Sequence, residues 1–91
     1  MYKTEVYILG QKYTIKGEKT PEYVESLAAY VDEKLRKVYE QNPNLTPLRA
    51  AILACFYVAD ELEETKKILE ETKKKLNNLE NQTNELLSLL D

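Results

Sequence analysis

The chain has 91 residues, enough for one small domain, and contains no His, no Trp and a single Cys. Without His it lacks the usual proton shuttle near neutral pH and an imidazole metal ligand, and one Cys forms neither an intrachain disulfide nor a thiolate metal cage. Thirteen basic against sixteen acidic side chains give a net charge of -3, which offers phosphates no overall attraction. We therefore expect that the protein is not an enzyme and has no catalytic residue. We also expect that it binds no cofactor, no metal and no nucleic acid.

The N-terminal residues show no targeting segment. They lead directly into an alternating pattern without the apolar core of a signal peptide, and no run in the chain approaches the roughly 20 apolar residues of a membrane span. These features predict a cytoplasmic protein with no membrane span.

Apolar and polar residues alternate from the N-terminus to Lys16, which predicts a β-hairpin. Glycine at the first central position suits a two-residue type II′ turn, so we place the turn at Gly10-Gln11. This register pairs Val6 with Ile15, Ile8 with Tyr13, and Glu5 with Lys16. A lone hairpin is marginal in water, so we expect strands from another copy or support from helices.

A first helix is predicted to begin at Thr20-Pro21, where Thr is a helix cap and Pro suits the first helical position. Asn42-Pro43 ends it. Its apolar residues recur at helical spacing and form one buried stripe: Val24, Leu27, Ala28, Val31, Leu35 and Val38.

Thr46-Pro47 repeats this start signal for a second helix, which contains no further Gly or Pro. From Leu48 to the end it would span about 66 Å at roughly 1.5 Å per residue, too long for a compact domain of this size. Residues 48–58 are apolar nearly all round and need enclosure that a hairpin and one helix cannot supply. We therefore expect a head that pairs with the head of a second chain.

Beyond Asp60 the sequence becomes rich in Glu, Lys, Asn and Leu, with no aromatic residue. Counted from Leu48, thirteen consecutive a/d positions of a heptad carry no charge, which predicts a coiled coil. Its oligomerisation seam contains Leu62, Leu69, Leu76, Leu79, Leu86 and Leu90. The fold class is α+β: a β-hairpin and short-helix head (1–60), then a coiled-coil arm (61–91) continuing the helix that starts near 47.

The e and g positions of the arm favour a parallel dimer, because they oppose Glu61 to Lys66 and Lys75 to Glu80 on the partner. Ile68 would remain wet at an e/g position of a two-stranded coil. Four strands would bury it, so we expect a dimer of dimers, with the two dimers packed antiparallel.

Five segments form a recognisable pattern along the chain: Val6-Tyr7-Ile8-Leu9-Gly10-Gln11-Lys12-Tyr13-Thr14-Ile15, Pro21-Glu22-Tyr23, Ala29-Tyr30-Val31-Asp32-Glu33-Lys34, Ala50-Ala51-Ile52-Leu53-Ala54 and Ala59-Asp60-Glu61-Leu62. In this order and spacing they resemble the bacterial cell-division protein ZapA family over nearly the whole chain. The resemblance implies a non-enzymatic cytosolic protein at the division site that binds the tubulin-like GTPase FtsZ and cross-links its filaments.

The resemblance also places the FtsZ contact in the head, with a basic residue just after the hairpin glycine, which Lys12 matches. Lys34, Arg36 and Lys37 are further candidates because they are basic and lie off the apolar stripe. A plainer explanation is that basic residues near a helix C-terminus suit the helix dipole. The alternative function is a generic coiled-coil adaptor or small chaperone whose hairpin head binds unrelated clients.

Overall fold

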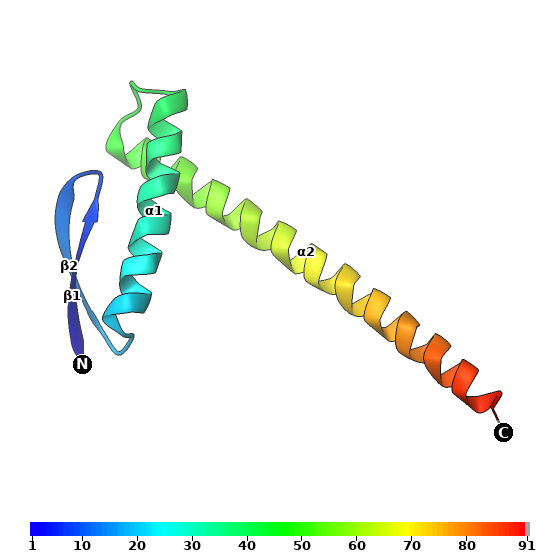
Figure 1. Cartoon of the computed structure of the whole chain (residues 1–91). Helices are drawn as coiled ribbons and strands as arrows, with labels where there is room; N and C mark the ends of the chain where they lie inside the picture. Colours follow the sequence, from blue (N-terminus) through cyan, green and yellow to red (C-terminus); the bar gives the residue numbers. More distant parts are fainter. Residues whose placement is uncertain (91) are drawn as a thin grey trace. The chain divides into compact units, whose positions relative to one another are not determined.

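The computed structural model describes residues 1–90 and contains one hairpin and two helices (Figure 1). The elements are β1 (Tyr2–Ile8), β2 (Gln11–Gly17), α1 (Pro21–Gln41) and α2 (Pro47–Ser88). The predicted α+β fold, a hairpin and a helix followed by a long C-terminal helix, is confirmed. The chain divides into two compact units, Met1–Val58 and Ala59–Asp91.

The hairpin turn differs from the prediction by one residue. Its two central residues are Leu9 and Gly10, with φ of 53° and 78°, and Ile8 pairs with Gln11 across it. Two positive φ angles define a type I′ turn, with Gly10 at the second central position rather than the first. The predicted register is therefore wrong.

Each pairing in the ladder moves by two residues as a result. Val6 pairs with Tyr13, not Ile15, and Lys16 lies opposite Lys3, not Glu5. Because side chains alternate with a period of two, a shift of two keeps every residue on its predicted face. The apolar face is therefore made of the predicted residues, whereas Lys16 does not lie opposite Glu5 as predicted.

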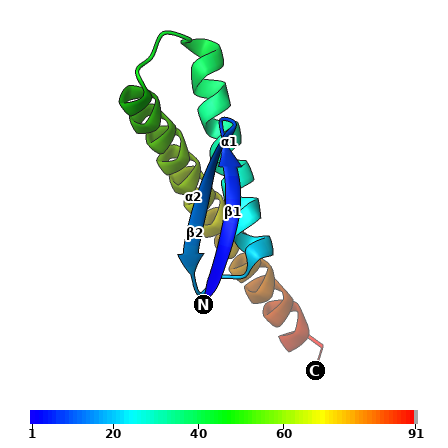
Figure 2. The ribbon, with the colours of Figure 1, turned by 90° about the vertical axis from the view of Figure 1, so that its left-hand side faces the viewer.

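The hairpin lies alongside α1, which packs against β1 (Figures 1 and 2). Thr4 and Val6 of β1 are buried, whereas β2 is exposed along its length apart from a half-buried Gly17. The head thus has a covered strand and an open strand.

Both helices begin where the sequence predicts. The Thr20 hydroxyl accepts a hydrogen bond from the Tyr23 amide at 3.4 Å, and the Thr46 hydroxyl accepts one from the Arg49 amide at 3.4 Å. Each satisfies one of the amides left free at a helix start.

A small core joins α1 to the beginning of α2. Val38 and Ala50 are fully buried and Ala54 is 7% exposed, with Leu35, Tyr39, Leu45 and Leu53 packed around them. On either side of these core residues α2 has exposed apolar side chains: Leu48 is 71% exposed and Phe56 is 69% exposed. One chain therefore encloses only part of the apolar segment 48–58.

Within residues 1–90, neither α1 nor α2 contains the continuous apolar stretch that a membrane-spanning helix requires.

Candidate functional site

The Asp32 carboxylate connects the hairpin turn to α1. Its Oδ1 accepts a hydrogen bond of 2.7 Å from the Leu9 amide, and its Oδ2 accepts one of 2.8 Å from Arg36 Nε. Asp32 and Arg36 are four residues apart, so they lie on one side of the helix. This side of α1 holds the tip of the hairpin.

The two hydrogen bonds also set the ionisation of Asp32. The bond from Arg36 is the main cause that holds the pKa of Asp32 below its ordinary value, the Leu9 amide acts in the same direction, and partial desolvation opposes them. Both donors favour the charged form, so Asp32 is an anion at neutral pH.

The predicted basic residues of α1 each lie close to another side chain of the same helix. The guanidinium of Arg36 is engaged by Asp32, and Lys37 Nζ lies 3.1 Å from Glu33 Oε1. Lys34 Nζ lies 5.1 Å from the centre of the Tyr30 ring. Because α1 continues to Gln41, its last turn contains no basic residue. The helix dipole therefore does not account for these cations.

Lys12 stands on β2 directly opposite Tyr7. Its Nζ lies 3.5 Å from Glu5 Oε1, and both side chains are more than half exposed. Lys12 and Arg36 are both linked to the hairpin tip, Lys12 as the second residue after Gly10 and Arg36 through Asp32. Lys34 and Lys37 make the contacts given above within α1.

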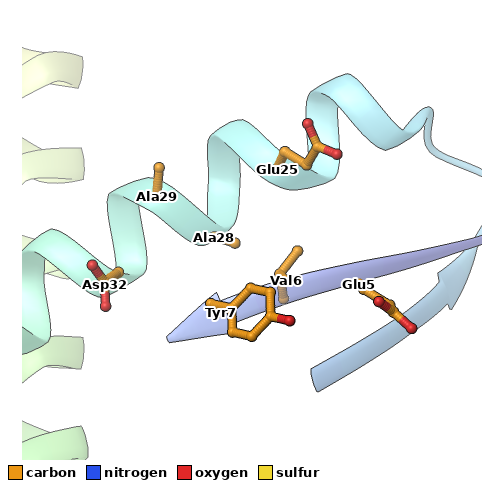
Figure 3. A pocket seen from close by; sticks show the side chains of 7 residues that line it. All are labelled: Glu5, Val6, Tyr7, Glu25, Ala28, Ala29 and Asp32. Atoms are coloured by element: carbon orange, nitrogen blue, oxygen red, sulfur yellow. The ribbon is translucent and has the colours of Figure 1, made fainter. Parts of the chain in front are cut away.

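A cleft of about 370 Å³ is lined by residues of both β1 and α1 (Figure 3). Its lining residues are Glu5, Val6, Tyr7, Glu25, Ala28, Ala29 and Asp32. Among residues 1–90 no group of His, Cys, Asp or Glu side chains is arranged to hold a metal ion. Cys55 is a free, exposed thiol in the single chain.

An apolar groove of about 340 Å³ lies between the inner face of the hairpin and α1. Its apolar lining comprises Val6, Ile8, Ile15, Val24, Leu27, Ala28 and Val31. Leu27 and Val31 belong to the predicted buried stripe, yet they are 48% and 41% exposed. The stripe on α1 is thus only partly covered within one chain.

The predicted seam of the arm is exposed in the single chain. Its leucines are 53–79% exposed: Leu62, Leu69, Leu76, Leu79, Leu86 and Leu90. In the same unit Lys66 Nζ lies 3.5 Å from Glu63 Oε1 of its own helix, where an interchain pairing with Glu61 was predicted. An apolar stripe at heptad spacing on an otherwise charged helix is the pattern of a coiled-coil surface.

The protein-family model described as "Cell division protein ZapA" matches residues 4–90. The chain belongs to the ZapA cell-division protein family. A ZapA from Halalkalibacterium halodurans is 37% identical over 67 residues, which cover 74% of each chain. A ZapA from Bacillus pumilus is 37% identical over 65 residues, which cover 71% of this chain and 76% of the relative.

A solved structure extends this relation to three dimensions. It is a ZapA mutant dimer from Geobacillus stearothermophilus, 30% identical to this chain with a TM-score of 0.61, and the match covers 84% of this chain and 88% of that one. As a member of the ZapA family the chain is a non-enzymatic cell-division protein.

Two features of the head escaped the sequence reasoning. Asp32 was not predicted as a site residue, although its spacing of four residues from Arg36 indicates that the two charges lie side by side on the helix. Lys3 and Lys16 were not identified as neighbours because the predicted register separated them.

Proposed function

We propose that this ZapA-family chain binds FtsZ filaments and cross-links them at the division ring, as a parallel coiled-coil dimer that assembles into a dimer of dimers. The observation that supports assembly is the exposed apolar surface of α2, where Leu48, Phe56 and the seam leucines stand uncovered in a single chain. Soluble proteins seldom leave so much contiguous apolar surface without a partner.

Filament cross-linking follows from having more than one head per assembly. Each head alone offers a small, charged contact of modest affinity. Joining two or more heads through the arms makes the second binding event intramolecular, which raises the overall affinity and connects two filaments. The arm therefore serves bundling, and the head serves binding.

Lys12 is the proposed FtsZ contact that the family resemblance supports best, and it is held beside the hairpin turn. Lys34, Arg36 and Lys37 are proposed as accompanying contacts. Arg36 is the least available of them, because its guanidinium is engaged by Asp32 at 2.8 Å.

Co-sedimentation with FtsZ polymers tests binding. The full-length chain is expected to pellet with the polymers, and Lys12→Glu is expected to pellet less because it reverses a contact charge. Wild-type protein that stays in the supernatant would refute the proposal and favour the generic adaptor.

Bundling is tested separately, by electron microscopy of the same polymers. Leu86→Glu places a charge in the seam and is expected to leave filaments unbundled. Asn77→Glu, outside the a/d positions, is the matched control and is expected to bundle like the wild type. Equal bundling by both variants would contradict a role for the seam.

A further inference from the structure

The outer face of the hairpin has an unusual cross-strand pair. Lys3 on β1 lies directly opposite Lys16 on β2 in the observed register. Residues directly opposite have Cβ atoms about 4.5–5.5 Å apart, and like charges at such positions destabilise a hairpin. The two lysines therefore occupy an arrangement that hairpin stability alone does not favour.

The other charges on this face of the hairpin do not compensate the pair. The outer face carries six side chains: Lys3, Glu5, Tyr7, Lys12, Thr14 and Lys16. Its one carboxylate, Glu5, already pairs with Lys12 at 3.5 Å. Figure 3 shows Glu5 pointing away from α1, whereas Val6 points toward it. The face thus has a net positive charge on a chain whose overall charge is -3.

We propose that the outer face of the hairpin binds an acidic segment of a protein partner, with Lys3 and Lys16 together receiving its carboxylates. This deepens the proposed function, on which it rests, by adding two residues on the face that already holds Lys12. Charge complementarity is the argument: an incoming carboxylate between two opposed ammonium groups relieves their repulsion and gains both attractions.

The observations favour a protein over a nucleic acid. The face has no Arg, the residue that binds phosphates with two hydrogen bonds. The side chain of Tyr7, 63% exposed on the same face, offers the aromatic contact common at protein interfaces.

The acidic chemistry is tested with a fluorescently labelled peptide of ten glutamates, titrated against the full-length chain and followed by anisotropy. Lys3→Gln/Lys16→Gln is expected to weaken binding about fivefold, since two exposed ion pairs are lost. Lys67→Gln/Lys74→Gln removes the same charge from the outer face of the arm and is the matched control. Equal weakening by both double variants would overturn the proposal, as would tighter binding of a ten-nucleotide DNA strand through the same two lysines.

Lys16→Glu separates binding from folding. It places a carboxylate opposite Lys3, so hairpin stability is expected to hold or rise while peptide binding falls. If the thermal unfolding temperature and the affinity for the peptide both fell in Lys16→Glu, Lys16 would have a structural role and the proposal would be wrong.

Co-sedimentation with FtsZ polymers distinguishes the two levels of the argument. If the wild type pellets and Lys3→Gln/Lys16→Gln pellets equally, the acid-binding face is refuted while the proposed function stands. If the glutamate peptide binds through both lysines but the wild type does not pellet, the face stands and FtsZ binding falls.

Discussion

The Asp32 carboxylate accepts a 2.7 Å hydrogen bond from the Leu9 amide, 23 residues earlier in the chain. Leu9 has a φ of 53°, a conformation that costs a non-glycine residue about 1–2 kcal/mol. In this turn the Leu9 amide has no partner in the ladder, so a carboxylate from α1 both satisfies it and holds the strained residue. The bond fixes the turn that precedes Lys12.

Removing this carboxylate is expected to loosen the hairpin tip. In Asp32→Ala the Leu9 amide loses its acceptor, and its hydrogen exchange, measured by NMR, should become faster than in the wild type. Glu33→Gln is the control, because it alters the neighbouring carboxylate, which pairs with Lys37 and does not contact the turn. Unchanged exchange at Leu9 in Asp32→Ala would show that the bond does not hold the tip.

The same carboxylate makes stability depend on acidity. Its pKa is lowered in the folded chain, so the unfolded chain binds the proton more readily and folding is favoured above the unfolded pKa of about 3.9. That contribution should be complete at pH 6 and lost as the pH falls below 4 through the folded pKa. Urea unfolding of wild type and Asp32→Asn at pH 6 and pH 3 measures it, and the two proteins should differ less at pH 3.

The two glycines provide a matched test of the turn. Gly10 has a φ of 78°, whereas Gly17 has an ordinary strand conformation, and a Cβ at either site would meet no atom within 4 Å. Gly10→Ala should therefore lower the free energy of unfolding by about 1–2 kcal/mol through backbone strain. Gly17→Ala should change it by less than about 0.5 kcal/mol. Equal effects in chemical denaturation would argue against the observed turn.

Thr4 carries a buried hydroxyl that has no hydrogen-bond partner within residues 1–90, and the residue is only 3% exposed. Replacing it by Val keeps the branched shape and removes the unsatisfied group. Thr4→Val should raise the free energy of unfolding by about 1 kcal/mol. Thr14→Val, on the exposed outer face, should have little effect. A loss of stability in Thr4→Val would indicate that a second chain hydrogen-bonds the hydroxyl in the assembly.

A charge in the seam is expected to reduce the mass of the assembly. Leu76→Glu should halve it or more in light scattering, because a buried carboxylate at an a position disfavours the coiled coil. Asn77→Glu, the adjacent residue outside the a/d positions, should leave the mass unchanged. An unchanged mass for Leu76→Glu would refute the seam.

The helices and their starts were predictable because their signals are local. Thr20-Pro21 and Thr46-Pro47 determine where each helix begins through side chains a few residues away, and the observed caps agree. The heptad spacing of the arm is likewise a property of adjacent turns. Local rules were sufficient wherever the physical cause was local.

The turn was not predictable from local rules, because a leucine at positive φ is held by a residue of another element. Its cause, the Leu9–Asp32 bond, spans 23 residues. The error carried over to the head surface, since the register decides which charges face each other. Lys3 and Lys16 lie opposite each other in the observed register, whereas the predicted register kept them apart.

The uncovered apolar side chains of α2 make the stability of this protein depend on its concentration. If the free energy that keeps the chain folded comes partly from association, it must fall whenever the protein is diluted. A cell that makes too few copies would then have not merely fewer assemblies but shorter-lived polypeptides, because lone chains would display Leu48 and Phe56 to proteases and chaperones. Below a certain expression level, such a protein would be degraded as single chains instead of only forming fewer assemblies.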